Sequence, residues 1–263
     1  IYQDLVGFVL YHRHRRHFAE MIEADLHGTS ASTQQISFFE EFKADAKYLY
    51  NIPKSDFKKI DIAHLFACFF QLRRAVGYIF HYIVGSSPVT SHLRQTIWQS
   101  IFTHDMRRYY RSLYGRMGEV PTLITGPSGT GKELVARAIA YSRYIPFDPK
   151  RSCFEEDFRQ SFYPLSLSAL ANSVIESELF GHMRGSYTGA TADRIGFFEA
   201  SGPLGTVFLD EVGDLSPKLQ RELLRVLEEG EVRPLGSGRS IQVDVRVISA
   251  TNQDLAQTAD RPF

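Results

Sequence analysis

The sequence predicts an α/β fold with a parallel sheet covered by helices on both faces, preceded by an all-α region. From residue 95 onward, short apolar runs alternate with amphipathic stretches, which is typical of strands alternating with helices in a parallel sheet. Before residue 95, glycine is scarce and aromatic residues recur at helical spacing. We therefore expect a helical domain over residues 1–94 and an α/β domain over residues 95–263.

Four strands and two helices are expected in the α/β domain. The strands are predicted at residues 121–125, 162–167, 206–209 and 241–249, and the helices at residues 132–141 and 219–229. Ligands of such sheets bind at the carboxyl ends of the strands. The polar motifs of this domain follow strand ends, so we expect its chemistry to lie at that edge.

Three helices are expected in the first domain. Apolar residues recur at helical spacing over residues 38–49 and 62–84, and a third, long helix is predicted from Thr90 or Ser91 towards Tyr114. These helices would bury their aromatic side chains against one another. A small helical bundle is the expected result.

Composition limits the class of protein. Thirty basic residues balance thirty acidic ones, so net charge does not indicate a nucleic-acid-binding face. The most apolar stretch carries Arg73 and Arg74 near its middle, which would be costly inside a bilayer, so we expect a buried helix and no membrane span. Cys68 and Cys153 lack metal-ligand spacing and are expected to be reduced, buried thiols of a cytoplasmic protein, with a disulfide as the alternative.

A glycine-rich loop follows the first predicted strand of the α/β domain and opens a helix. Glycines let backbone N–H groups turn towards phosphate oxygens, and the helix N-terminus favours an anion. Lys132 supplies a charge for the β- and γ-phosphates. We expect this loop to bind ATP with magnesium; the alternative is a glycine-rich turn without a ligand. The binding residues are Gly126, Pro127, Ser128, Gly129, Thr130, Gly131, Lys132 and Glu133.

Two carboxylates follow the apolar strand that ends at Leu209. Asp210 is expected to hold magnesium, and Glu211 to act as the general base that polarises the attacking water. Glu133 stands where many phosphate loops have Ser or Thr, so a hydroxyl ligand for magnesium is missing there. The metal would therefore depend on Asp210, the phosphates and water.

Polar residues also end the last predicted strand. Thr251 or Asn252 could orient the water or contact the γ-phosphate, and we take Asn252 as a catalytic residue beside Glu211 and Lys132. A simple turn or helix cap remains the alternative, because Asn and Thr favour both.

Several segments resemble the AAA+ domain of bacterial sigma-54-dependent transcription activators. The family carries ESELFGH followed by GAFTGA, and this chain has ESELFGH at 176–182 and GSYTGA at 185–190. The resemblance continues through GFFEA at 196–200 and covers roughly residues 95–263. It implies a three-layer AAA+ core in which the phosphate loop and the acidic pair are the Walker A and Walker B motifs.

The resemblance also implies a partner. In the family the hexapeptide loop protrudes from the pore of a hexameric ring and engages sigma-54. ATP hydrolysis would move this loop and remodel sigma-54 RNA polymerase, so that promoter DNA opens. The loop residues here are Gly185, Ser186, Tyr187, Thr188, Gly189 and Ala190. Without the surrounding match, a glycine-rich surface turn with Tyr187 packed on its own domain would be favoured.

This sequence departs from the family pattern at particular positions. Ser186 and Tyr187 replace Ala and Phe, and Pro127 replaces a common Glu. Ser166 stands where the family has an Asn that pairs with the Walker B glutamate, which puts nucleotide coupling in question. The chain is expected to stop before the arginine fingers, the lid and the DNA-binding helices, so Arg261 is not taken as an arginine finger. Hydrolysis is then expected to be slower by about a thousandfold or more.

A basic run at residues 11–17 is the sharpest local feature of the first domain. It could bind nucleic acid, a metal or an acidic partner, and His14 and His17 share one helical face. No acidic or cysteine partner has obvious ligand spacing, so a solvated basic face is expected. By resemblance, this domain is regulatory.

Two rival functions remain open from the sequence. The chain could be an AAA+ remodeller of another protein target. Alternatively, Ser166 and Glu133 suggest a non-hydrolysing module that interacts with a partner when ATP is bound.

Overall fold

The computed structural model describes residues 2–27, 35–51, 60–117, 119–157 and 161–254. The chain divides into two compact units. The helical unit comprises Ile1–Gly115 and Tyr141–Arg159, and the α/β unit comprises Arg116–Ala140 and Gln160–Phe263. The domain boundary at residues 94 and 95 stays a prediction, while the compact units divide the chain at other positions.

The α/β unit contains a parallel sheet of four strands in the order β1-β8-β5-β4. The strands are β1 (Thr122–Thr125), β4 (Phe162–Ser166), β5 (Thr206–Asp210) and β8 (Arg246–Thr251). β5 and β8 are buried along almost their whole length, which requires the near-continuous apolar runs seen in their sequences. The predicted α/β fold with a parallel sheet is confirmed.

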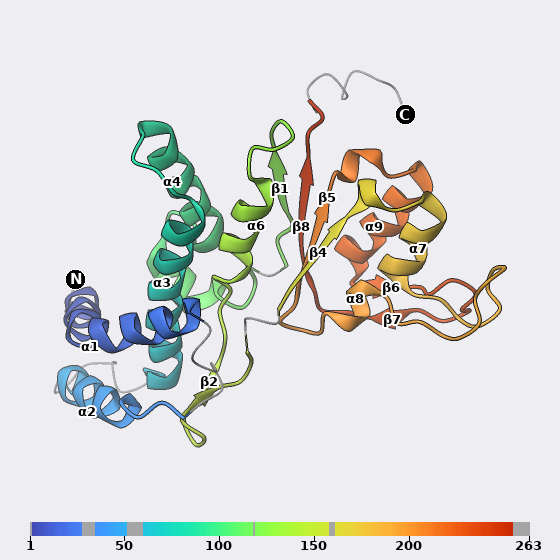
Figure 1. The fold of residues 1–263 in the computed structure, drawn as a ribbon. Coiled ribbons are helices and arrows are strands. Elements are labelled where there is room, and N and C mark those ends of the chain that lie inside the picture. The colour runs from blue at the N-terminus through green and yellow to red at the C-terminus, as the bar shows by residue number, and fades with distance from the viewer. Residues whose placement is uncertain (1, 28–34, 52–59, 118, 158–160, 255–263) are drawn as a thin grey trace. The chain divides into compact units, whose positions relative to one another are not determined.

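Helices cover both faces of this sheet (Figure 1). Helix α6 (Lys132–Ala140) contacts β1, β5 and β8, whereas α7 (Asn172–Phe180) and α9 (Pro217–Glu229) pack with the sheet in one apolar cluster. Val207 and Leu209 of β5 belong to this cluster, since alternate strand residues share a face. Short helical segments η4 (Leu167–Ala169), α8 (Phe197–Ala200) and η5 (Val212–Asp214) complete the unit.

The single strand predicted at residues 241–249 is wrong, because the structure divides it. β7 (Ile241–Gln242) pairs antiparallel with β6 (Glu231–Val232), and only β8 joins the main sheet. Gly230 ends α9 in a left-handed conformation, and its carbonyl accepts a hydrogen bond from the N–H of Val243. The chain is therefore tied to the end of α9 before it enters the sheet.

The helical unit contains α1 (Tyr2–Leu26), α2 (Phe39–Tyr50), α3 (Ile62–Tyr82), α4 (Pro88–Phe102), α5 (Met106–Arg108) and a π-helical turn η2 (Tyr109–Leu113). It also includes the hairpin of β2 (Phe147–Asp148) and β3 (Cys153–Phe154). Its core is aromatic: Phe66 of α3 contacts the rings of Phe39, Phe42 and Phe147. The helical spacing over residues 38–49 and 62–84 is confirmed by α2 and α3.

Helix α3 buries polar groups together with its apolar face. The Gln71 amide donates to the hydroxyl of Tyr109 at 2.5 Å and to the carbonyl of Ser142 at 2.9 Å, and Arg74 donates to the carbonyl of Arg143.

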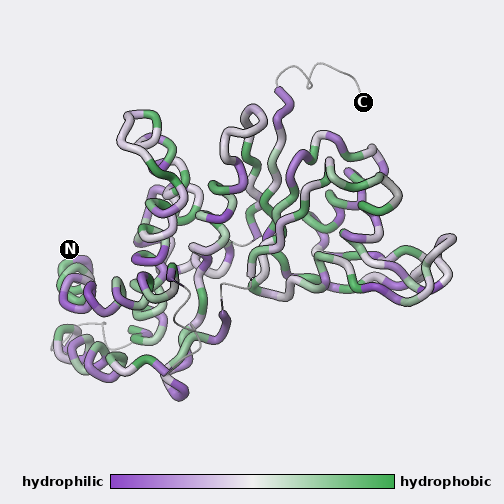
Figure 2. The backbone as a smooth tube through the Cα atoms, in the orientation of Figure 1, coloured by the Kyte–Doolittle hydropathy of each residue, from purple (hydrophilic) through white to green (hydrophobic). Residues whose placement is uncertain are grey.

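Hydrophilic residues are interspersed along the helices (Figure 2), and no helix among the described residues is long and apolar enough to cross a membrane. The two cysteines are buried free thiols, as expected.

Helix α4 differs from the long helix predicted from Thr90 or Ser91 towards Tyr114. It begins at Pro88, and the hydroxyl of Ser87 caps it by accepting the N–H of Thr90 at 3.1 Å, so Thr90 and Ser91 are not its caps. Proline suits the first helical position because its missing N–H would have no partner there. The helix stops at Thr103, whose φ is 63°, and therefore does not run on towards Tyr114.

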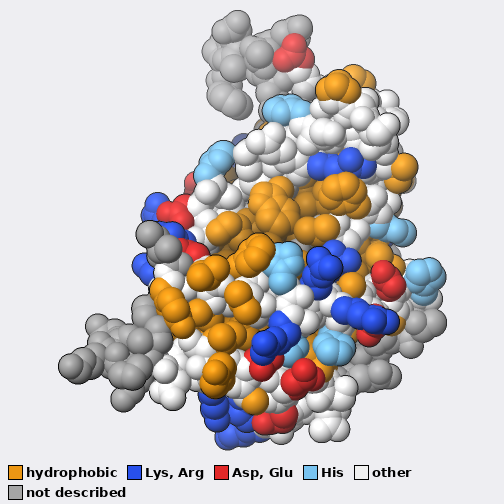
Figure 3. Space-filling view, turned by 90° about the vertical axis from the view of Figure 1, so that its left-hand side faces the viewer, with side chains coloured by type: hydrophobic (Ala, Val, Ile, Leu, Met, Phe, Trp, Pro, Cys, Tyr) orange, Lys and Arg blue, Asp and Glu red, His pale blue; other side chains and the backbone are white. Residues whose placement is uncertain are grey.

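Apolar side chains also reach the surface of the helical unit. Leu5, Phe8 and Phe80 are more than half exposed. Figure 3 shows a face of the molecule on which hydrophobic side chains gather, with basic, acidic and histidine side chains beside them.

Candidate functional site

The glycine-rich loop lies between β1 and α6, as the sequence predicts. Gly129 and Gly131 have φ of 79° and 89°, a region that favours glycine. The hydroxyl of Thr130 donates to the carbonyl of Pro127 at 2.8 Å and holds the turn. Within the described residues, the N–H groups of Gly129, Thr130 and Gly131 donate no backbone hydrogen bond. These three donors at a helix N-terminus form a cradle suited to phosphate oxygens.

Lys132 opens α6 and is almost fully buried. Its ammonium group lies 3.2 Å from the carbonyl oxygen of Gly126, 3.4 Å from that of Pro127 and 3.3 Å from Oε1 of Glu211. An ammonium needs partners when it is removed from water, and these three acceptors supply them. The charge is thus fixed at the glycine-rich loop.

Glu211 follows β5 in a left-handed conformation, with φ 61° and ψ 48°. This conformation costs a non-glycine residue about 1–2 kcal/mol, and the contacts of Glu211 offset it. Its Oε1 meets Lys132, its Oε2 accepts the N–H of Asn252 at 2.9 Å, and its own N–H donates to Oδ1 of Asp210 at 3.1 Å. An outlier held by several contacts in this way is a mark of a functional position.

Adjacent parallel strands bring these residues together. Thr125 of β1 pairs in register with Thr251 of β8, and the N–H of Gly126 donates to the carbonyl of Thr251 at 3.2 Å. β5 lies on the other side of β8, so Glu211 and Asn252 emerge beside the glycine-rich loop. The structure therefore groups Lys132, Glu211 and the backbone of Asn252.

Asp210 and Glu133, the two other charged residues predicted in the site, differ in their hydrogen-bond partners. The side chain of Asp210 accepts one N–H and keeps a second carboxylate oxygen for a cation. Glu133 pairs with Arg137 one turn along α6, at 2.7 Å, and is half exposed. The residues present thus fit a triphosphate with a divalent cation held through Asp210, while Glu133 is engaged on the helix surface.

Ser166 ends β4 directly beside Asp210 in the sheet register. Its hydroxyl lies 3.4 Å from that of Ser168. Among the described residues it makes no hydrogen bond to Glu211, whose two carboxylate oxygens are held by Lys132 and Asn252. Ser166 therefore does not make the hydrogen bond to Glu211 that an amide side chain at this position would make.

The segment 185–190 is a tight loop after α7. The N–H of Gly185 donates to the carbonyl of Ala190 at 2.8 Å, and the N–H of Ala190 donates to that of Tyr187 at 3.0 Å. Gly185 and Gly189 have φ of 80° and 109°, so the turn needs glycine at both positions. Tyr187 is 44% exposed, and its ring meets His182 edge-on at 5.1 Å. An aromatic side chain is therefore presented at the surface.

Close backbone contacts fix the base of this loop. A Cβ on Gly196 would lie within 2.6 Å of backbone atoms of Leu179, Phe180 and Gly181. A Cβ on Gly236 would lie 2.7 Å from Cβ of Ser186. These glycines let the loop, α7 and the β6–β7 segment approach one another, a role that the sequence pattern alone did not reveal.

A family model described as "Sigma-54 interaction domain" matches residues 99–262, which is more than half of the chain. The chain belongs to the sigma-54 interaction domain family. Its P-loop core is therefore that of an AAA+ domain, an ATPase class with roles in transcription regulation. The family resemblance seen in the sequence is confirmed.

Two curated transcription regulators are similar to part of this chain. The hydrogenase transcriptional regulatory protein HoxA of Cupriavidus necator is 49% identical over 137 residues, covering 52% of this chain and 26% of HoxA. A Nif-specific regulatory protein of Bradyrhizobium diazoefficiens is 41% identical over 181 residues, covering 69% of this chain and 26% of that protein. The chain thus spans about a quarter of the length of these relatives.

A solved structure agrees with the fold. The crystal structure of NtrX from Brucella abortus matches with a TM-score of 0.50 and 28% identity, covering 76% of this chain and 40% of that one. The fold of this chain is thus similar to that of part of NtrX.

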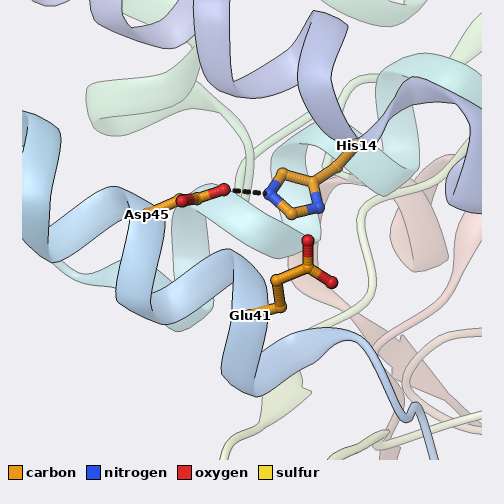
Figure 4. A group of neighbouring side chains, drawn as sticks. All are labelled: His14, Glu41 and Asp45. Carbon is orange, nitrogen blue, oxygen red and sulfur yellow. Dashed lines mark hydrogen bonds and ion pairs between the residues drawn. The ribbon is translucent and has the colours of Figure 1, made fainter.

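The basic run at residues 11–17 lies in the helical unit. The prediction that this run forms a solvated face is wrong for His14. That ring is fully buried, with Nε2 at 3.0 Å from Oδ2 of Asp45. Glu41 lies below the ring in the view of Figure 4, and one ligand atom from each of the three residues lies within 4.8 Å of the others. Arg13 also pairs with Asp45 at 2.7 Å, so the carboxylate already has a cation.

Two features of the site were missed from the sequence. The left-handed backbone of Glu211 has no residue-type signal, because glutamate rarely adopts it. The contact of the Asn252 backbone with Glu211 was also missed, since we expected the side chain of Asn252 to act. Only the strand order, which places β8 between β1 and β5, explains that contact.

Proposed function

We propose that this chain binds ATP with magnesium at Gly126–Glu133 and hydrolyses it. One observation carries the proposal: the ammonium of Lys132 lies 3.3 Å from the carboxylate of Glu211, beside a cradle of free backbone donors. Phosphoryl transfer needs little covalent chemistry from a protein, so catalysis rests on positioning and charge. This arrangement offers both.

Each residue has a role in the proposal. The loop N–H groups hold the phosphates, and Lys132 neutralises the β- and γ-phosphates. Asp210 would hold magnesium, which when bound neutralises charge that develops on the phosphate oxygens. Glu211 accepts the proton of the attacking water, and the N–H of Asn252 fixes the orientation of that carboxylate.

The ion pair between Lys132 and Glu211 suggests how binding prepares catalysis. Both side chains are mostly buried, so each charge depends on its partners. Phosphate oxygens compete with Glu211 for the ammonium of Lys132 when a triphosphate binds. The carboxylate would then lose its cation and become free to accept a proton from water.

Nucleotide binding and turnover of matched variants test this proposal. Lys132→Ala should weaken ATP binding by about 100-fold, because a charge-assisted contact to phosphate is lost. Glu211→Gln should keep binding and lose turnover by about 100-fold to 10,000-fold, the usual contribution of a general base. Lys218→Ala, an exposed lysine paired with Glu176, is the control and should change neither. Loss of ATP binding in Glu211→Gln would overturn the assigned roles.

The proposed partner is sigma-54 RNA polymerase. Family membership and the exposed aromatic ring of Tyr187 support this proposal. Hydrolysis would move the loop at residues 185–190 and remodel the polymerase, so that promoter DNA opens. A cytoplasmic, hexameric ring would carry out this remodelling.

Ser166 favours one rival function. Its hydroxyl is engaged with Ser168 and not with Glu211, so the contact that couples nucleotide to loop in the family is missing. A non-hydrolysing module would bind ATP without turnover, and the wild-type rate decides between the two. A remodeller of another target would hydrolyse ATP and fail to capture sigma-54.

A further inference from the structure

The helical unit contains a cavity of about 430 Å³ between helices α1 and α3 and the segment around residues 106–111. Binding sites for small molecules have volumes of this order. Its walls are largely apolar, with Phe8 from α1 and Leu65, Phe69 and Leu72 from α3. Aromatic rings and branched side chains of this kind suit a flat, apolar molecule.

Three tyrosines also line the cavity: Tyr11, Tyr50 and Tyr110. Their phenolic hydroxyls have no hydrogen-bond partner in the part of the chain that the structure describes. Tyr50 is buried and Tyr11 and Tyr110 are partly buried, and a phenolic hydroxyl that lines a cavity can donate to a ligand. Burial raises the pKa of Tyr50 to about 12 and raises that of Tyr110 as well. Tyr50 and Tyr110 are therefore neutral donors at physiological pH.

The lining of the cavity also carries an excess of positive charge. Asp4 and Arg107 form an ion pair there, with Nε of Arg107 at 3.0 Å from Oδ1 of Asp4. Arg111 is a second guanidinium, and within the described residues its side chain makes one hydrogen bond, to Oε1 of Gln3 at 3.4 Å. A long bond to a neutral amide leaves most of its donors for an anionic group.

We propose that this cavity binds a small aromatic carboxylic acid. The ring packs against Phe69 and Leu65, the carboxylate pairs with Arg111, and a polar substituent on the ring meets the tyrosine hydroxyls. The site lies wholly within the helical unit, so it stands independently of the proposed ATPase activity.

Calorimetric titration of the whole chain with 4-hydroxybenzoate tests the proposal. We expect saturable binding with a dissociation constant of about 1 mM or tighter. The neutral analogue 4-hydroxybenzamide should bind at least about 10-fold more weakly, because it cannot pair with Arg111. Arg111→Gln should remove this preference. Arg16→Gln, on an exposed arginine of α1 that pairs with Glu20, should leave it unchanged.

Filling the cavity provides a second, charge-independent test. A Cβ on Gly7 would meet only the ring of Phe69, at 3.9 Å, so Gly7→Ala should fold and keep binding. Gly7→Leu places a branched side chain in the same space and should abolish binding of both compounds. Fluorescence of Trp98, the chain's single tryptophan, reports whether the helical unit of each variant remains folded. Tyr11→Phe, which removes one hydroxyl, should weaken 4-hydroxybenzoate and spare benzoate.

Two results would overturn the proposal. The first is no saturable binding of 4-hydroxybenzoate at millimolar concentration by the folded wild-type chain. The second is binding that neither Gly7→Leu nor Arg111→Gln alters, which would place the ligand elsewhere.

Discussion

The two units of this chain differ in how their functional polar groups are satisfied. In the α/β unit, Lys132 and Glu211 each have several partners, and each is a partner of the other. In the helical unit, the hydroxyls of Tyr11, Tyr50 and Tyr110 line a cavity and have no partner among the described residues. A ligand of the first site must therefore exchange existing contacts, whereas a ligand of the second adds new ones.

Backbone packing also differs between the two units, and one glycine substitution in each unit tests this difference. The substitution in the α/β unit should have the largest effect on stability. Gly196→Ala should destabilise the α/β unit by about 3 kcal/mol, because the added Cβ would overlap backbone atoms that cannot move aside. Gly7→Ala should be neutral or stabilise the helical unit by about 0.5–1 kcal/mol, since alanine favours a helix. Urea unfolding followed by circular dichroism measures the first and Trp98 fluorescence the second.

Equal costs at the two glycines would contradict this contrast. Such a result would mean that the α/β unit adjusts its backbone around residue 196 as easily as the helical unit accommodates a methyl group on α1.

Helix caps sharpen the comparison with a smaller effect. Ser87→Ala should cost about 1 kcal/mol, because the hydroxyl that accepts the N–H of Thr90 at 3.1 Å is lost. Ser216→Ala in the α/β unit should cost less, since its bond to the N–H of Leu219 is longer, at 3.4 Å. Thermal unfolding of each variant measures the costs, and a larger effect at Ser216 would reverse the expected order.

The smallest expected effect depends on pH and lies in the helical unit. Burial alone would raise the pKa of Asp45, but hydrogen bonds from Arg13 and His14 outweigh it and leave that pKa below its ordinary value. The stability that Asp45 adds is thus complete above the unfolded pKa of about 3.9 and is lost as pH falls through the lower folded pKa. Asp45→Asn should remove this acid-dependent loss, which is below about 1 kcal/mol.

Trp98 fluorescence during urea unfolding at pH 6 and at pH 3 measures this difference. Glu20→Gln, at an exposed carboxylate on α1, is the control. Identical pH dependence in wild type and Asp45→Asn would show that the carboxylate gains nothing from its two partners.

The sequence predicted the α/β unit well because its motifs are local. Glycines with positive φ, a lysine at a helix start and an apolar run before Asp210 each dictate their own geometry. The division of the strand at residues 241–249 was missed, because apolar and polar residues alternate without a break from β7 into β8 and only the partners of the two strands differ. The site residues stay predictions about chemistry, which the geometry supports.

The helical unit was harder to read because its features join distant segments. His14 has no metal-ligand spacing to Asp45, yet α1 and α2 bring the two within 3.0 Å. The cavity combines residues from α1, α3 and residues 106–111, so no local sequence pattern predicts it. Helical periodicity predicts which residues are buried on a helix and leaves open which helices meet.

Capture of purified sigma-54 tests the central claim most directly, namely that nucleotide bound at Lys132 and Glu211 controls the loop at residues 185–190. We expect capture with ADP–aluminium fluoride, a mimic of the hydrolysis transition state, and none without nucleotide. Tyr187→Ala should abolish capture, whereas Tyr48→Ala, an exposed tyrosine of the helical unit, should retain it. Capture of sigma-54 that is the same with and without nucleotide, or that is retained by Tyr187→Ala, would contradict the claim.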